Sequence, residues 1–333
     1  MKPDDLAGRR GAHTTRRYTM LVLVSALTGA AGINLTEVLL RSTPIPLIVI
    51  VVVANTTGGL FLLVAAALQG SRSWHRWPAA DWLRLVAAAA TTYALGFLLL
   101  YTAIDLAGSS TTALLGRLEA LFVVGLAVVF LGERWTARHW LASCLGVTGA
   151  LLVAFDPQSL QLRLQAGELL ALLGALVVAA GIIILKSLVD RQDGQLVTGY
   201  GLILGGVMLA PLVLVDADTV SATRAAIGSV GGYLAVRGLL LGVSWATYNV
   251  AMRHIGAARA AVLFLSVVVF VMLIQLVIFV LAPGLGLRLP AHLLAALLGG
   301  VLIGASIVLL HRQEQAPQGV DPGTAFRTDP RKE

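Results

Sequence analysis

Long apolar segments alternate with short polar ones along nearly the whole chain. The apolar runs are roughly 18 to 25 residues long, which is enough for an α-helix to cross a lipid bilayer. They lie at about 18–40, 45–69, 81–104, 110–131, 138–155, 167–188, 196–215, 232–253, 257–281 and 290–310. The pattern therefore predicts ten membrane-spanning segments.

The composition leads to the same interpretation. Hydrophobic residues make up 58% of the 333 residues and charged residues only 12%, a balance that excludes a soluble domain of this size. A span that faces lipid must satisfy its own backbone hydrogen bonds, and these runs are too long and too uniformly apolar for the strands of a barrel. The chain is predicted to be an all-α integral membrane protein.

The positions of the basic residues indicate how the chain is oriented. Cytoplasmic segments of membrane proteins are enriched in Lys and Arg. With the amino terminus in the cytoplasm, 18 of the 24 basic residues fall in inner segments, 5 fall in outer segments, and Arg117 lies within a span. We expect a multi-pass protein of the plasma membrane, the inner membrane of the cell, with both termini cytoplasmic. This distribution accounts for the net charge of +7, so no nucleic-acid partner is predicted.

The sequence repeats itself at a nearly constant spacing. Residues 30–33 (Ala-Ala-Gly-Ile) recur as residues 179–182, and Phe97 corresponds to Trp245, 148 positions later. Five spans in each copy make the second copy enter the membrane from the opposite side, as in the inverted repeats of secondary transporters. The predicted organisation is a cytoplasmic segment at 1–17, a first repeat at 18–155, a linker loop at 156–166, a second repeat at 167–312 and a disordered cytoplasmic tail at 313–333.

Two ionisable residues, Arg117 and Glu119, lie inside the fourth predicted span. Charged side chains are costly within a bilayer and usually have a function there. Because they are two positions apart on a helix, they point to different sides and should not form an ideal ion pair with each other. Arg117 is suited to hold a substrate carboxylate in two parallel hydrogen bonds, and Glu119 is suited to bind an amine or a coupling proton. The alternative is that both residues tie neighbouring helices together.

Polar residues near the outer end of the first span extend the candidate substrate site. Asn34 and Glu37 are three positions apart and share one helix face. Glu37 is also close enough to the helix end for its carboxylate to reach the membrane surface, and the same holds for its repeat counterpart Lys186. Both interpretations of Glu37 stay open at this point.

Aromatic residues form stripes on two spans that correspond in the repeat. Tyr93 and Phe97 share a face of the third span, and Trp245 and Asn249 lie in the eighth. Phe97 and Trp245 are candidates for the wall of a cavity. An interfacial aromatic belt is the alternative, and it is the preferred interpretation for the two remaining rings of these spans, Tyr101 and Tyr248.

The charges do not follow the repeat, although the apolar framework does. The repeat counterparts of the three candidate charged residues have no charge or the opposite one: Leu265 for Arg117, Val267 for Glu119 and Lys186 for Glu37. The asymmetric positions are therefore where we expect the substrate to bind.

Enzymatic activity is not predicted. The chain lacks the Gly-x-x-x-x-Gly-Lys phosphate-binding loop of ATP-driven transporters and the zinc-binding His-Glu-x-x-His pattern. It also lacks a Gly-x-Ser-x-Gly turn that could present a nucleophilic serine. We therefore expect no catalytic residue, no cofactor and no metal.

Three segments resemble the EamA repeat of the drug/metabolite transporter superfamily. They are Leu118–Phe122 (Leu-Glu-Ala-Leu-Phe), Phe130–Arg134 (Phe-Leu-Gly-Glu-Arg) and His139–Leu141 (His-Trp-Leu). The resemblance covers about residues 18 to 312 and implies export of amino acids, drugs or other small metabolites by alternating access. Ala120 stands where many members of that family have proline, and Ser266-Val267-Val268 replaces their usual polar or proline-containing segment.

The resemblance and the asymmetric charges together predict a secondary active transporter, an exporter of small organic metabolites such as amino acids. Its expected partners are a small-molecule substrate, the lipid bilayer and a coupling proton. Two alternatives remain: a flippase-type transporter of drugs or lipid carriers, and a non-transporting membrane sensor or scaffold.

Overall fold

The computed structural model describes residues 3–70, 77–107, 112, 115–133, 135–154, 166–214, 217–281 and 293–312. Across these ranges the chain forms helices and no strands, which confirms the predicted all-α class. The predicted carboxy-terminal tail and nearly all of the predicted linker loop lie outside the described residues.

The helices follow the apolar runs of the sequence. In chain order they are α1 (Pro3–Ser42), α2 (Leu47–Leu68), α3 (Ala79–Ala88), η2 (Ala89–Leu95), α4 (Gly96–Ala107), α6 (Glu119–Leu131), α7 (Ala137–Ala154), α8 (Ala166–Val189), α9 (Gly194–Leu214), α10 (Ala217–Ile255), α11 (Ala257–Phe264), α12 (Ser266–Leu281) and α13 (Leu293–Arg312). Gly132 ends α6 and Gly256 separates α10 from α11. Their φ angles are 64° and 87°, a region that glycine enters readily because it has no Cβ.

Within the described residues, seven helical segments are long and apolar enough to cross a membrane: Arg16–Leu40, Leu47–Leu68, Ala79–Leu100, Ala166–Val189, Gly194–Leu214, Ile227–Ile255 and Ala257–Leu281. Three further apolar helices, Glu119–Leu131, His139–Leu152 and Leu297–Leu309, are shorter. Each segment overlaps one of the predicted runs. The chain is thus a multi-pass membrane protein, and the number of its spans stays a prediction.

The third apolar run contains a π-helical segment. α3, η2 and α4 follow one another without interruption from Ala79 to Ala107, and η2 is the π-helical part. The wider turns of a π-helix are rare in proteins and are frequent at functional sites. η2 carries Tyr93, a candidate site residue, in the middle of the run.

The fourth and ninth apolar runs, each predicted to be one span, are interrupted in the structure. A turn at Arg117 and Leu118 precedes α6, and Leu265 separates α11 from α12. At each break the backbone makes bonds three residues apart in place of four: Leu118 N–H donates to Leu115 O (3.1 Å), and Leu265 N–H donates to Val262 O (3.2 Å). Such bonds tighten a helical turn, so the first break forms although Ala120 replaces the proline of the family pattern.

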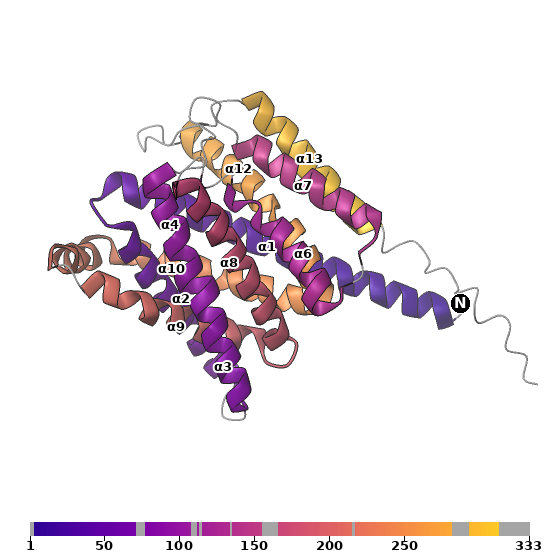
Figure 1. Cartoon of the computed structure of the whole chain (residues 1–333), viewed down its shortest axis with the longest axis horizontal. Helices are drawn as coiled ribbons and strands as arrows, with labels where there is room; N and C mark the ends of the chain where they lie inside the picture. The colour runs from indigo at the N-terminus through magenta and orange to yellow at the C-terminus, as the bar shows by residue number, and fades with distance from the viewer. Residues whose placement is uncertain are drawn as a thin grey trace, which may run out of the picture.

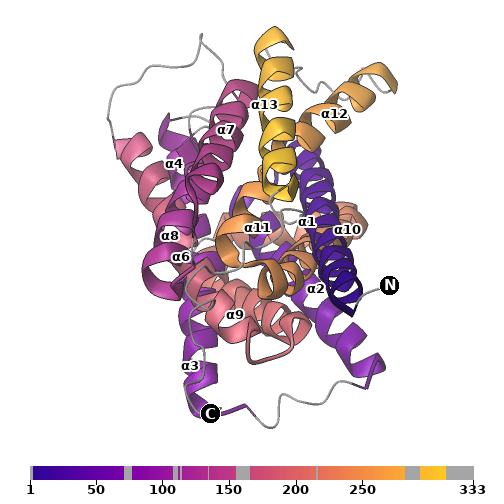
Figure 2. The same ribbon diagram turned by 90° about the vertical axis from the view of Figure 1, so that its right-hand side faces the viewer.

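The helix packing repeats with the sequence. α1 packs against α10 and α12, and α8 packs against α4 and α6, so corresponding helices of the two copies form two corresponding groups of three. α2 lies along α9, and α7 lies along α13; the second pair stands side by side in both Figure 1 and Figure 2. The largest core cluster includes buried residues from both groups, among them Tyr93, Ala120 and Met252.

Candidate functional site

A chain of aromatic rings joins the two groups of helices. The Tyr93 ring from η2 meets the Trp245 ring from α10 edge to face, with centroids 5.1 Å apart, and meets Phe97 at 6.5 Å. Trp245 continues to Tyr248 at 5.8 Å, and Tyr248 to Phe264 at 5.4 Å. The structure therefore brings together Tyr93, Phe97 and Trp245, the three aromatic candidates from sequence.

Tyr93 is the largest fully buried side chain among the described residues, with 0% of its surface exposed. It fits because two glycines of α9 have no side chain. A Cβ atom added to Gly205 would lie 2.4 Å from the Tyr93 Cβ, and one added to Gly201 would lie 2.9 Å from the ring. Both distances are shorter than carbon atoms tolerate. The backbone of α9 thus packs directly against the Tyr93 side chain.

Polar atoms without partners lie beside the rings. Asn249 is fully buried, and its amide donates to the Thr198 hydroxyl at 2.8 Å. The Tyr93 hydroxyl lies within interaction range of Asn249, but among the described residues neither this hydroxyl nor the Asn249 Oδ1 has a partner in hydrogen-bond geometry. A buried polar group without a partner costs about 1–3 kcal/mol. These atoms can recover that energy by binding a polar ligand or water.

Arg117 and Glu119 flank the break before α6. Arg117 lies in the turn itself and Glu119 is the first residue of the helix. The two are within electrostatic range of each other, and Glu119 is within range of Tyr248. In the described part of the chain, no ion pair joins Arg117 to Glu119, and the buried Arg117 Nε has no hydrogen-bond partner. Two oppositely charged side chains thus lie beside the aromatic rings without forming an ion pair with each other.

Asn34 and Glu37 connect α1 to α12. The Asn34 amide donates to Ala30 O at 3.0 Å and to Val271 O at 3.4 Å, while the Gln275 amide donates to the Glu37 carboxylate at 3.1 Å. These bonds give both residues a role in holding one helix group together. The Asn34 Oδ1 is buried without a partner among the described residues.

Sequence reasoning assigned Tyr248 to the membrane surface, and the structure corrects this. Only 4% of its surface is exposed, and it packs between Trp245 and Phe264. The spacing of three residues indicated that Tyr248 and Trp245 share a helix face, but it did not indicate that this face is buried inside the bundle. The side chain of Tyr101, assigned in the same way, lies outside the described residues.

Two further residues were missed as candidates: Arg237 of α10 and Asn55 of α2. Arg237 Nε donates to the Thr36 hydroxyl of α1 at 2.6 Å, and Asn55 is fully buried. From the sequence, Arg237 could be either an anchor at the outer end of the eighth run or a basic group within it, because the run has no sharp boundary there. For Asn55, the signal was the short polar run Asn55-Thr56-Thr57 inside an otherwise apolar helix.

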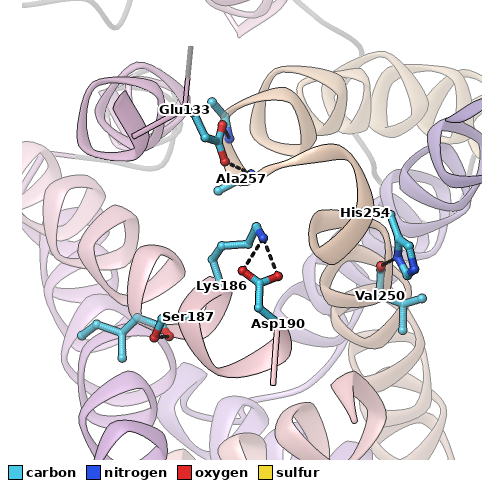
Figure 3. A network of polar contacts seen from close by, with 9 residues as sticks. Glu133, Lys186, Ser187, Asp190, Val250, His254 and Ala257 are labelled. Carbon is cyan, nitrogen blue, oxygen red and sulfur yellow. Dashed lines mark hydrogen bonds and ion pairs between the residues drawn. The ribbon is translucent and has the colours of Figure 1, made fainter. Parts of the chain in front are cut away.

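A second polar network lies at the end of the bundle where α8 and α10 finish (Figure 3). Glu133 accepts the Ala257 N–H at 2.8 Å and the Ala258 N–H at 3.3 Å, so its carboxylate caps the amino terminus of α11. Lys186 pairs with Asp190 through two bonds of 2.5 and 2.6 Å. The glutamate of the Leu-Gly-Glu pattern, Glu133, thus connects the first repeat to the second.

Replacing Glu133 with alanine should lower the free energy of unfolding by about 0.5–2 kcal/mol, since a helix loses its capping acceptor. Glutamine keeps one acceptor oxygen and should lose less than alanine. Thermal unfolding of both purified variants in detergent measures the difference. Equal melting temperatures for the parent and the alanine variant would contradict the capping role.

Comparisons with known proteins bear on the whole chain. The family model of the EamA-like transporter family matches twice, at residues 16–155 and 165–312. A solved structure titled "Crystal structure of protein" superposes with a TM-score of 0.67 at 16% sequence identity, over 90% of this chain and 98% of that chain, which shows a shared fold. No curated protein matches. With both copies matched over nearly their full length, the chain belongs to the EamA-like transporter family.

Proposed function

We propose that this chain is a secondary active transporter that exports small organic metabolites such as amino acids. Family membership makes it a membrane transporter of small molecules. The observation that carries the finer proposal is the ring of Tyr93 packed on Trp245, because this contact bridges the two helix groups and is bordered by unpaired polar atoms. A site of that kind suits a solute with both apolar and polar parts.

The paired packing supports transport by alternating access. The group of α1, α10 and α12 moves against the group of α8, α4 and α6, and the aromatic contact between them opens toward one side of the membrane at a time. Inverted repeats produce such motion because each copy provides the same element in the opposite orientation. Both termini remain in the cytoplasm in this arrangement.

The charged residues give the site its selectivity. Arg117 binds the substrate carboxylate, and Glu119 binds its amine or a coupling proton. Phe97 and Trp245 form the cavity wall, with Tyr93 and Asn249 beside them. Asn34 and Glu37 contribute from α1, through the same side chains that hold α12.

Flux into proteoliposomes tests this proposal. From a panel of amino acids, other small carboxylates and a cationic dye, purified protein should move at least one amino acid or carboxylate. Arg117→Ala and Glu119→Gln should each lower the flux by about tenfold or more, because each removes a hydrogen bond to a charged group. Arg253→Ala, which removes an exposed arginine from the end of α10, is the matched control and should transport like the parent.

If both variants transport like the parent, the assigned site is wrong. Selective movement of the dye or of a lipid carrier would favour the flippase alternative. A protein that moves none of the panel, and that none of its members stabilises against heat, would favour the sensor or scaffold. A true ligand at about 100 times its dissociation constant adds roughly 2.7 kcal/mol, so thermal unfolding detects it.

A further inference from the structure

A small pocket lies where α1, α2, α4 and α10 meet. Thr36, Asn55, Phe97 and Arg237 line it together with the apolar side chains of Ile50 and Leu241. It has room for about one water molecule. Thr36 is near the carboxy-terminal end of α1 and Ile50 near the start of α2. The pocket is therefore at the opposite end of the bundle from the Glu133 network, which lies where α10 finishes.

Arg237 supplies a positive charge to this pocket. The backbone of α10 is kinked at Val230, and Arg237 follows this kink by seven positions, or about 10 Å of helix. Its Nε donates to the Thr36 hydroxyl at 2.6 Å. A Cβ added to Gly32 of α1 would lie 3.2 Å from its Nη1, so the guanidinium is seated directly against the α1 backbone. An arginine within a membrane span usually faces the interior of the bundle or a water-filled cavity.

Asn55 supplies an acceptor to the same pocket. Its amide nitrogen donates to Tyr93 O at 3.3 Å, which fixes the orientation of the side chain. The Oδ1 atom is buried and has no hydrogen-bond partner in the described part of the chain. An occupant of the pocket that carries an N–H or O–H donor would satisfy it.

A cation and an unpaired acceptor in one small pocket define the chemistry of the occupant. Arginine holds a carboxylate through two parallel hydrogen bonds, and the acceptor requires a donor on the neighbouring carbon. We propose that Arg237 and Asn55 form a subsite for the end group of a 2-amino or 2-hydroxy acid, with the side chain of that acid directed toward Phe97. The subsite rests on the proposed transport function.

This subsite is distinct from the break at Arg117. α6 packs against α7, α8 and α11, whereas Arg237 belongs to the group of α1, α10 and α12. The acid meets the two arginines at separate stages of its passage. The pocket must widen to admit the end group, and the movement of α1 and α10 away from α2 and α4 provides that room.

Four related probes test the subsite on the purified full-length protein. L-Leucine and 2-hydroxy-4-methylpentanoate carry both features, 4-methylpentanoate lacks the donor, and L-leucinamide lacks the carboxylate. Dissociation constants follow from thermal stabilisation at increasing probe concentrations. The parent should bind the first two most tightly and leucinamide most weakly.

Arg237→Gln should weaken the three carboxylates by about tenfold or more and leave leucinamide unchanged. Arg237→Lys keeps the charge but not the paired geometry and should fall between glutamine and the parent. Arg224→Gln, which removes an exposed arginine from the same helix, should change nothing. Equal weakening of all four probes, or no weakening of leucine, would overturn the role of Arg237.

Asn55→Leu should weaken leucine and the hydroxy acid by about tenfold and leave 4-methylpentanoate unchanged. Asn55→Asp keeps an acceptor, adds a negative charge, and should favour leucine over the hydroxy acid. No change in either preference would overturn the role of Asn55. A parent that binds none of the four probes overturns the whole subsite; flux of another solute from the wider panel would then leave the transport proposal standing.

Discussion

Valine in place of Gly205 is expected to prevent stable folding of the protein. Even the Cβ atom of that residue would lie 2.4 Å from the Tyr93 Cβ and 3.2 Å from its backbone carbonyl carbon. Neither atom can turn aside, because one is backbone and the other is attached directly to it. The clash forces α9 away from η2, and overpacking without a way to relax costs about 3 kcal/mol or more.

The measurement is the yield of monodisperse protein in detergent together with its melting temperature, which should fall by more than about 5 °C. Gly304→Val is the matched control, since no atom in the described structure lies within 4 Å of a Cβ at that position of α13. It should melt like the parent. If the two variants behave alike, α9 does not depend on contact with Tyr93.

Tyr93→Ala is expected to have the second largest effect. Removing a fully buried aromatic side chain leaves a cavity and costs about 3–5 kcal/mol. The rings of Phe97 and Trp245 also lose their shared neighbour, because Tyr93 touches both. Loss of transport should accompany loss of stability, since the contact between the helix groups disappears. Thermal unfolding and proteoliposome flux measure the two effects separately.

Tyr93→Phe is the control that separates the contribution of the aromatic ring from that of the hydroxyl group. The hydroxyl is buried without a hydrogen-bond partner among the described residues, so its removal should change the free energy of unfolding by less than about 1 kcal/mol. Because the stability of this variant stays nearly unchanged, its proteoliposome flux reports directly on the role of the hydroxyl in transport. A phenylalanine variant that is stable but inactive would assign the hydroxyl to the substrate, whereas a strong loss of stability would contradict the unpaired geometry.

The all-α class and the family were predictable from sequence because both depend on long-range regularities. Apolar runs of membrane length and a repeat near 148 residues survive many local substitutions. The seven long apolar helices lie within a few residues of the predicted runs. The aromatic candidates Tyr93, Phe97 and Trp245 were found because a helical spacing places residues on one face.

The positions of the helix breaks and the burial of individual side chains were not predictable from the sequence. The break at Leu118 lies between Arg117 and Glu119, and the break at Leu265 precedes Ser266. Polar residues also occur inside continuous helices, and no proline marks either break, so the sequence alone does not predict them. Tyr248 was placed at the surface because periodicity reports the direction of a side chain and not its distance from the membrane centre. The importance of Asn55 depends on a neighbour from another helix, Tyr93, and no pattern within α2 contains that contact.

The two interrupted helices make the interior electrically unequal. Each break exposes the amino-terminal end of a new helix partway along an apolar run, and such an end carries roughly half a positive charge. α6 begins with Glu119, two positions after Arg117, whereas α12 begins with Ser266 and has no acidic residue in its first turn. The duplicated backbone thus creates two corresponding helix ends inside the bundle, and only the end in the first repeat has a positive and a negative side chain beside it.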